Sequence, residues 1–426
     1  MSKAIIAIII IACTVFLYTK ETFSLAVTSM LSVTAMMTTG VLTASDAFSC
    51  FSNDVVMLIA GMMFIVEAFT QTGLIGQFGA LLGKYVNKGE KNFVILLTIV
   101  LAFGSLFINN SPLMTAFLPL VTAIIGVSGG AITKKNTFMP MAFACLIGGC
   151  GSLAGTTLPG VVSNVLVEYG QKEFRFFETL PVTLIILFVV VICYKLFLFD
   201  LMKRIFDFEE APDMATSDAE ETVVFHKRNA TVTLIVFALC VIGFVTTPFG
   251  WTVGQISIVS AVILIVTKCI DGRESLKRVN WSILIVIAST LGIAKGFVVS
   301  GAGQIVINWM MNTFGHAMNQ PVVLFLVFMI TGYLLSMFMS NGSLCAMLTA
   351  VAVPLAMDLG QDPLPVALGL SFACQQAMAT PAASVTIALS QGANYRFKDY
   401  LRFGGLMGTI CFVTGCLAII VIYGLI

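Results

Sequence analysis

Apolar segments long enough to cross a lipid bilayer follow one another along most of this 426-residue chain. A membrane-spanning helix needs about 20 mainly apolar residues. Such segments are expected near residues 4–18, 23–43, 54–74, 138–165, 179–200, 229–247, 252–267, 280–300, 363–390 and 402–425. The sequence therefore predicts an all-α polytopic membrane protein.

The composition agrees with this fold class. Hydrophobic residues make up 58% of the chain and charged residues only 10%, whereas soluble domains are about 25% charged. The net charge of +1 gives no general attraction to nucleic acid. Eleven cysteines are present, but they lie mainly in apolar runs without a CxxC pair, and the chain has only two histidines. We interpret the cysteines as packing residues and expect no metal centre, no cofactor and no enzymatic activity.

Two further apolar stretches, 91–127 and 321–358, are interrupted near their centres by polar residues. The first is broken at 109–112 and the second at 340–343. Each stretch could form two full spans or one re-entrant hairpin that turns inside the membrane.

The distribution of positive charge decides between these two possibilities. If both stretches are hairpins, 17 of the 22 basic residues fall on one side of the membrane, which the positive-inside rule makes the cytoplasmic side. They are Lys20, Lys84, Lys88, Lys91, Lys134, Lys135, Lys203, Arg204, Lys227, Arg228, Lys268, Arg273, Lys277, Arg278, Arg396, Lys398 and Arg402. This topology places both termini outside the cell, in a multi-pass protein of the plasma (inner) membrane.

The two halves of the chain show an internal repeat. Asn53 begins a span that ends at Gly73, and Asn280 begins one that ends at Gly301. Around the two breaks, SLFINNS (105–111) matches SMFMSNG (336–342). Because the predicted topology gives the halves opposite senses in the membrane, we expect inverted repeats with broken helices, as in secondary transporters.

The expected organisation has four parts. Residues 1–52 form N-terminal transmembrane helices, and residues 53–200 form the first repeat, with hairpin 91–127 entering from the cytoplasm. Residues 201–228 are rich in acidic residues and read as a cytoplasmic linker. Residues 229–426 form the second repeat, with hairpin 321–358 entering from outside.

The polar breaks have the chemistry to bind ions. Irregular backbone at membrane depth is tolerated where it is buried in protein or lines a wet cavity. Helix-end N–H groups attract anions, while carbonyl, amide and hydroxyl oxygens bind small hard cations. Ser105 and Asn110 provide such oxygens in the first half, and Ser336 and Asn341 provide them in the second. These residues predict an anion site that needs no arginine and is assisted by bound Na⁺.

Glu67 and Lys295 are the charges placed deepest in predicted spans, at matching positions of the two halves. Charges inside a membrane are costly and are often functional. We consider that they pair with each other, link repeat to repeat, reach a wet crevice or extend to the membrane interface.

These motifs resemble the divalent anion:sodium symporter (DASS) family of the ion transporter superfamily. Family members carry a Ser-Asn-Thr signature in each hairpin, which here corresponds to Asn109-Asn110-Ser111 and Ser340-Asn341-Gly342. A Gly-Thr-Pro-Pro type break follows in each half, at Gly155-Thr156 and at Ala379-Thr380-Pro381. Asn109, Ser111 and Gly342 depart from the signature.

The resemblance implies a homodimer of elevator-type transporters that carry di- or tricarboxylates or sulfate together with Na⁺. The expected Na⁺ ligands are Ser105, Asn109, Asn110, Gly155, Ser336, Ser340, Asn341 and Ala379. The expected solute-binding residues are Asn110, Ser111, Thr156, Asn341, Ser343, Thr380 and Pro381.

We therefore expect Na⁺-coupled uptake of a small anion of the di- or tricarboxylate class. The alternatives are a Na⁺/H⁺ or other ion antiporter of the same superfamily and an anion exchanger. An antiporter needs a titrating carboxylate in the core, for which Glu67 is the deep candidate. A channel and a membrane-embedded enzyme fit less well, because inverted repeats suit alternating access and the two histidines fall in loops.

Overall fold

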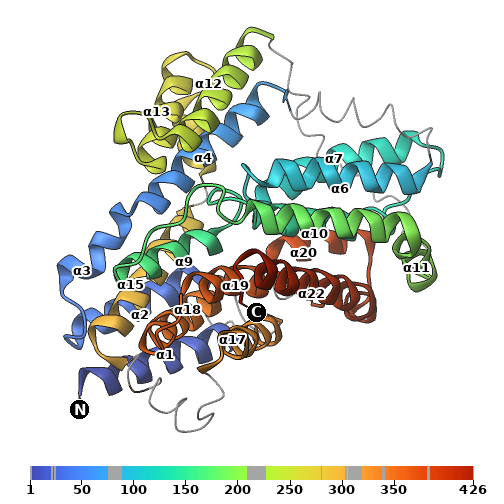
Figure 1. Cartoon of the computed structure of the whole chain (residues 1–426). Coiled ribbons are helices and arrows are strands. Elements are labelled where there is room, and N and C mark those ends of the chain that lie inside the picture. The colour runs from blue at the N-terminus through green and yellow to red at the C-terminus, as the bar shows by residue number, and fades with distance from the viewer. Residues whose placement is uncertain are drawn as a thin grey trace.

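The computed structural model describes residues 2–20, 23, 25–74, 89–208, 227–279, 281–302, 305, 319–337, 341–380 and 384–425. Its regular elements are helical throughout these ranges (Figure 1). The chain begins with α1 (Lys3–Lys20), α2 (Leu25–Thr38), the short α3 (Ala44–Ser49) and α4 (Asp54–Gln71). Later, α12 (Lys227–Thr246) and α13 (Val253–Val266) pack beside α4, and α15 (Trp281–Val299) packs beside α2.

Each interrupted apolar stretch forms two helices that meet at the predicted break. In the first half these are α6 (Glu90–Ser105) and α7 (Asn110–Val127), and in the second α17 (Pro321–Ser336) and α18 (Asn341–Asp358). In both pairs the first helix has 16 residues and the second has 18. At 1.5 Å per residue such helices are about 24–27 Å long. Because this is less than the roughly 30 Å hydrocarbon core, their lengths suit hairpins better than two full spans.

The next span is broken in both halves, as the sequence predicted. After the first hairpin, α8 (Phe138–Gly149) ends, and α9 (Thr157–Glu168) begins after an irregular segment. After the second hairpin, α19 (Leu364–Gln375) ends at a corresponding place and the short α20 (Val385–Leu389) follows. Helices α8 and α19 both have 12 residues. The order and length of elements therefore repeat, while their opposite sense in a membrane stays a prediction.

Four helices among the described residues are long and apolar enough to cross a membrane: Ala44–Gln71, Leu180–Ile205, Lys227–Thr246 and Phe397–Ile422. The second joins α10 (Leu180–Cys193) to α11 (Phe199–Ile205), and the last joins α21 (Phe397–Asp399) to α22 (Gly405–Ile422), in each case through a π-helical turn. Large apolar side chains such as Phe188 and Leu239 stay exposed on these helices. A lipid environment explains this exposure, because contiguous apolar surface is rare on soluble monomers.

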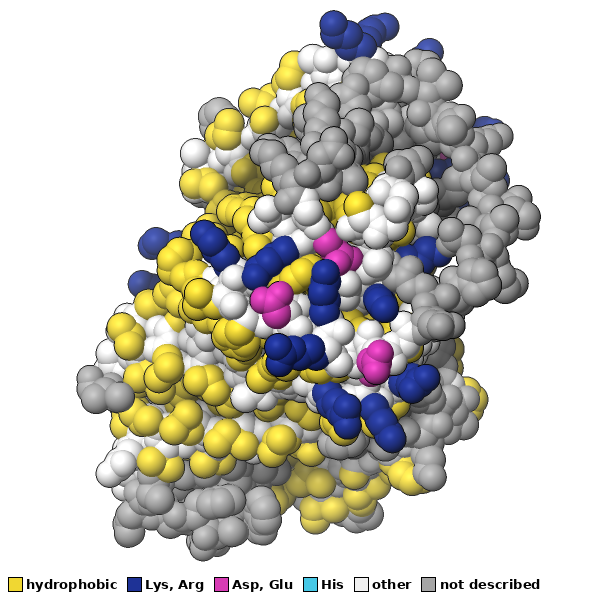
Figure 2. All heavy atoms as spheres, turned by 90° about the vertical axis from the view of Figure 1, so that its right-hand side faces the viewer, with side chains coloured by type: hydrophobic (Ala, Val, Ile, Leu, Met, Phe, Trp, Pro, Cys, Tyr) yellow, Lys and Arg dark blue, Asp and Glu magenta, His cyan; other side chains and the backbone are white. Residues whose placement is uncertain are grey.

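Basic residues from separate loops gather at one end of the hairpin region. Figure 2 faces the ends of α6, α7 and α11 and shows many Lys and Arg side chains there. Glu90 accepts hydrogen bonds from Thr133 and Asn136 and pairs with Lys203 at 3.0 Å. Tyr395 Oη donates to the carbonyl of Lys135 at 2.6 Å. These contacts bring together four of the predicted basic loops, those around 91, 134, 203 and 396. The side of the membrane on which these loops lie stays a prediction.

Helices α6 and α8 approach each other at a glycine. A Cβ placed on Gly148 would lie 2.0 Å from the carbonyl oxygen of Ala102 and 2.5 Å from its Cα. Real Cβ atoms do not approach backbone atoms so closely, so glycine allows the first hairpin to lie directly on the broken helix. This contact determines how near the hairpin break comes to the break in the next span.

Glu67 and Lys295 do not pair with each other. Glu67 binds Arg278 Nη1 at 2.9 Å and also accepts from Gln71 Nε2 at 2.7 Å. Lys295 pairs with Asp46 at 3.1 Å. Glu67 thus links the two halves of the chain, because Arg278 ends α14 (Gly272–Arg278) in the second half. Of the hypotheses considered for Glu67, the link from repeat to repeat fits this contact.

We predict that Glu67→Gln lowers stability by about 1 kcal/mol and leaves most of the transport rate intact. Arg278 is half-exposed, and pairs of this kind contribute about 0–1 kcal/mol. The thermal unfolding midpoint of purified protein and its uptake rate would measure the two effects. Glu274→Gln is the matched control, because Glu274 binds the other guanidinium nitrogen at 2.6 Å but is exposed. Complete loss of uptake in Glu67→Gln with normal folding would instead favour the antiporter hypothesis.

Candidate functional site

Asn110 lies at the centre of a cluster of oxygen atoms at the first hairpin break. Its side chain is buried at the start of α7, and Ser105, at the end of α6, is fully buried beside it. Ser105 Oγ lies 2.7 Å from Asn110 Oδ1 and donates to the carbonyl of Cys145 at 2.8 Å. The hairpin thus brings together two predicted Na⁺ ligands and adds a backbone oxygen from α8.

The break in the following span closes over this cluster. Ser152 Oγ donates to the carbonyl of Leu106 and accepts from the N–H of Gly155 at 3.2 Å. A Cβ on Gly155 would lie 2.1 Å from the carbonyl oxygen of Ser105, and one on Gly149 would lie 2.0 Å from Asn110 Oδ1. The absence of side chains at both glycines therefore lets backbone and amide oxygens approach one another.

The Asn110 amide has two orientations, related by exchange of its terminal nitrogen and oxygen, and the hydrogen-bond network decides between them. With Oδ1 toward the cluster, the oxygen faces the carbonyls of Cys145 and Gly155. With Nδ2 there, it donates to Gly155 at 3.1 Å, Cys145 at 2.9 Å and Ser105 Oγ at 2.7 Å. Oδ1 then accepts from Gln375 Nε2 at 2.7 Å. The second orientation gives both ends of the Asn110 amide suitable partners in the absence of a cation, with its two N–H groups directed at three acceptors.

The second hairpin break has a similar hydroxyl contact. Thr380 Oγ1 donates to the carbonyl of Met337 at 2.8 Å, much as Ser152 binds Leu106 in the first half. Ser336 is fully buried and donates to the carbonyl of Tyr333 at 2.9 Å, while Ala379 is buried next to Thr380.

The structure describes some of the remaining predicted site residues but not others. Ser340 and Pro381 lie outside the described residues, as does the side chain of Ser343. Asn109, which is half-buried, is the N-cap residue of α7, and Thr156, which is buried, is the N-cap residue of α9. Neither side chain makes a hydrogen bond to the start of its helix.

The starts of several helices from opposite halves meet beside these breaks. Ser111 Oγ, in the first turn of α7, lies 3.0 Å from Thr386 Oγ1 of α20. A Cβ on Gly342, in the first turn of α18, would lie 3.8 Å from Thr157 Oγ1 at the start of α9. The start of α7 thus meets α20, and the start of α18 meets that of α9. Helix starts carry free N–H groups and the positive end of the helix dipole, which attract anions.

One predicted site residue has a buried oxygen without a partner. Asn341 Oδ1 is buried and has no hydrogen-bond partner in the described part of the chain. A buried acceptor left without a partner costs about 1–3 kcal/mol. This oxygen is therefore a candidate contact for a bound ion or solute.

Sequence reasoning missed several polar residues that the structure places here. Gln375 reaches Asn110 from the end of α19, and Thr386 and Ser152 make the contacts described above. Gln376 is also buried, and its amide has no partner among the described residues. A signal was present, because Gln375-Gln376 is a polar pair inside an apolar span directly before the Thr380 break.

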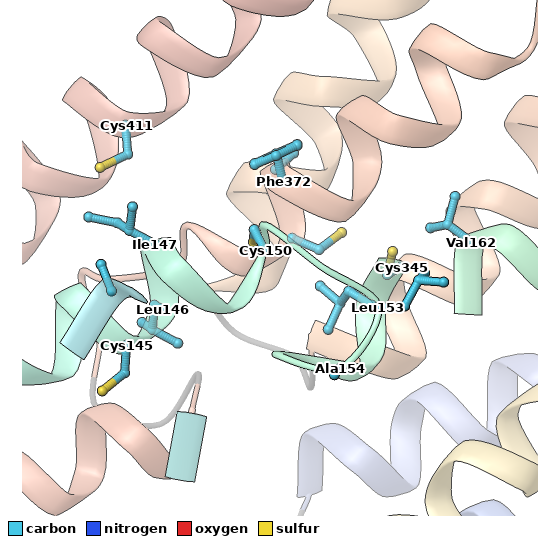
Figure 3. Packing of buried hydrophobic residues seen from close by; sticks show 14 of the residues in the cluster. Cys145, Leu146, Ile147, Cys150, Leu153, Ala154, Val162, Cys345, Phe372 and Cys411 are labelled. Carbon is cyan, nitrogen blue, oxygen red and sulfur yellow. The ribbon is translucent and has the colours of Figure 1, made fainter. Parts of the chain in front are cut away.

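The polar breaks are embedded in tightly packed apolar residues. Figure 3 shows Cys145, Leu146 and Ile147 of α8 and Cys150 and Leu153 of the following break, with Cys345, Phe372 and Cys411 from the second half. The labelled cysteines are free and buried, and the described residues contain no group of His, Cys, Asp or Glu that could hold a metal ion. Such surroundings strengthen electrostatic interactions at the breaks.

Comparison with known proteins supports the resemblance drawn from these motifs. The model of the citrate transporter family (CitMHS) matches residues 5–373, most of the chain. The chain belongs to this family. It is therefore a multi-pass membrane transporter and not an enzyme, and the DASS-type identification is confirmed.

Similar curated proteins include three transporters. The sodium-dependent dicarboxylate transporter SdcS of Staphylococcus saprophyticus is 23% identical over 407 residues, covering 85% of this chain and 75% of its own length. YfbS of Escherichia coli is 27% identical over 187 residues, or 44% of this chain. The match with sll0640 of Synechocystis is 23% identical over 180 residues, or 42% of this chain. The chain spans only 30% of the length of YfbS and 29% of that of sll0640.

Among solved structures, the YdaH transporter of Alcanivorax borkumensis has a similar fold. The TM-score is 0.61 at 13% sequence identity, and the match covers 92% of this chain and 89% of YdaH. At this identity the likeness concerns the fold alone, and it confirms the all-α polytopic architecture.

Proposed function

We propose that this transporter couples the uptake of a small anion of the di- or tricarboxylate class to Na⁺. The observation that carries the proposal is the oxygen cluster at the start of α7, around Asn110 and Gly155, with the starts of α9 and α18 close to each other at the end of the same break. Helix starts suit the solute's carboxylates, while the oxygens of Ser105, Asn110, Cys145 and Gly155 suit a hard monovalent cation. Placed side by side, the anion and the cation would stabilise each other.

The solute class follows from the charges of the site and from the family. The contacts at the breaks come from neutral amides, hydroxyls and backbone groups, so bound Na⁺ would provide much of the positive charge that a multivalent anion needs. The matching family is described as citrate transporters, and SdcS is described as a sodium-dependent dicarboxylate transporter. Both descriptions support carboxylates ahead of sulfate.

The same proposal includes the topology and assembly predicted from the sequence. The basic ends of the hairpin region face the cytoplasm of the inner membrane, both termini lie outside, and residues 53–200 and 229–426 act as inverted repeats. Two copies form a homodimer in which the hairpins and broken helices move relative to the membrane like an elevator. Gathering of the basic loops at one end supports this orientation.

Uptake of labelled succinate, citrate and 2-oxoglutarate into proteoliposomes tests the proposal. We expect saturable uptake that an inward Na⁺ gradient accelerates at least tenfold over a choline gradient. Uptake that requires a counter-anion inside, and not Na⁺ outside, would point to exchange. Failure of folded protein to take up any of the three would contradict the carboxylate assignment.

A further inference from the structure

Gln375 joins the ion-binding cluster of the first half to the broken helix of the second. It is the last residue of α19 and is almost fully buried, as is Asn110. Its Nε2 lies 2.7 Å from the terminal oxygen of Asn110 when the amide nitrogen of Asn110 donates to Gly155, Cys145 and Ser105. The orientation of the Asn110 amide therefore depends on hydrogen bonds to residues from both halves of the chain.

Binding of Na⁺ in this cluster requires the other orientation of Asn110. A cation needs oxygens, whereas the Nδ2 protons would point at it and repel it. Turning the amide brings Oδ1 to the cluster and directs Nδ2 at Gln375. Gln375 then has to accept a hydrogen bond, which it does by turning its own amide so that Oε1 replaces Nε2.

We propose that Gln375 is the positioning residue for the Asn110 amide, and that it sets the Na⁺ affinity of the first-half cluster by supporting both orientations. A glutamine suits this place because one side chain both donates and accepts. Na⁺ binding in the first half thereby turns an amide at the end of α19 in the second half. The inference rests on the proposed Na⁺ coupling.

Replacement of Gln375 with methionine removes both hydrogen bonds at nearly constant volume. In the cation-free orientation, Asn110 then leaves a carbonyl oxygen without a partner, and in the cation-bound orientation it leaves an N–H donor. Buried N–H groups without a partner are the rarer and less tolerated case. We therefore expect Gln375→Met to raise the Na⁺ concentration for half-saturation about tenfold.

The test is thermal unfolding of the purified full-length protein in detergent, with NaCl exchanged for choline chloride at constant ionic strength. A ligand that binds the folded state raises the unfolding midpoint with its concentration, so the titration gives the Na⁺ affinity without transport. Gln391→Met, at an exposed glutamine, is the matched control and should keep the wild-type Na⁺ dependence. Should Gln375→Met fold poorly, Gln375→Asn keeps an amide that is too short to reach Asn110 and should shift the affinity in the same direction.

A double mutant separates positioning from packing. Asn110→Asp has oxygens at both terminal positions, so its orientation no longer matters, and adding Gln375→Met should change the Na⁺ requirement less than twofold. An equal shift in both backgrounds would overturn the positioning role, and an unchanged Na⁺ requirement in Gln375→Met alone would overturn the inference. Absence of any Na⁺-dependent stabilisation of the wild type would overturn the Na⁺ coupling itself.

Discussion

Asn110→Ala should reduce Na⁺-driven uptake by at least a hundredfold while the protein still folds. The side chain is the one that contacts Ser105, the carbonyls of Cys145 and Gly155, and Gln375 at once. Its loss removes a proposed Na⁺ ligand and leaves buried polar groups without partners, each costing about 1–3 kcal/mol. Since each 1.4 kcal/mol is a factor of ten in affinity, two such losses account for the expected effect.

Uptake into proteoliposomes at saturating solute, measured across Na⁺ concentrations, would check this prediction. Asn341→Ala should have an effect of similar size, because Asn341 Oδ1 is buried at the corresponding break. Asn229→Ala is the matched control, since Asn229 makes a long 3.4 Å contact to Lys268 near the start of α12. Near-normal Na⁺-driven uptake by Asn110→Ala would show that the cluster around Asn110 is not the coupling site.

Gly148→Ala should prevent the first hairpin from seating on the broken helix. The added methyl group would lie 2.0 Å from a backbone oxygen of α6, and backbone cannot move aside as a flexible side chain can. Overpacking typically costs about 1–3 kcal/mol, and separation of α6 from α8 would also pull Ser105 away from the carbonyl of Cys145. We expect a clearly lower unfolding midpoint and uptake reduced at least tenfold.

The matched control is Gly126→Ala. Gly126 lies in α7 with nothing within 4 Å of the position of a Cβ, so alanine should be tolerated there, with about 0.5–1 kcal/mol of added helix stability. Unfolding midpoints of the two variants and their uptake rates would be compared directly. If Gly148→Ala behaved like Gly126→Ala, the close approach of α6 and α8 would not be needed for transport.

The pattern of apolar segments was enough to predict most helices and both broken stretches. The outer bounds of the pairs α6–α7 and α17–α18 fall within one residue of 91–127 and 321–358. The breaks begin earlier than predicted, because α6 ends at Ser105 and α17 at Ser336, four residues before each polar interruption, and α7 and α18 start inside those interruptions. Such breaks are recognisable because a polar cluster inside an apolar run is tolerated at membrane depth only where protein or a wet cavity surrounds it. The partners of Glu67 and Lys295 could not be predicted in this way, because ion pairing depends on which loops lie close together in space.

Candidate site residues were predictable where they repeated between the halves. Ser105 and Asn110 were found through their match with Ser336 and Asn341, and the structure places the first two in contact. Gln375 and Thr386 have no such match in the first half, so pattern comparison passed over them. Their importance comes from the packing of α19 and α20 against the opposite half, which a single sequence does not display.

The polar contacts between halves favour the proposed elevator movement over a rocking motion. Ser111 meets Thr386, Thr157 lies near Gly342, and Gln375 reaches Asn110. A rocking motion, in which one half tilts against the other about a fixed centre, would pull these partners apart in every cycle. In the proposed elevator movement, the hairpins and broken helices would shift together as one rigid body, and these partners would stay in contact. The sliding boundary would then run between that body and helices such as α4 and α13.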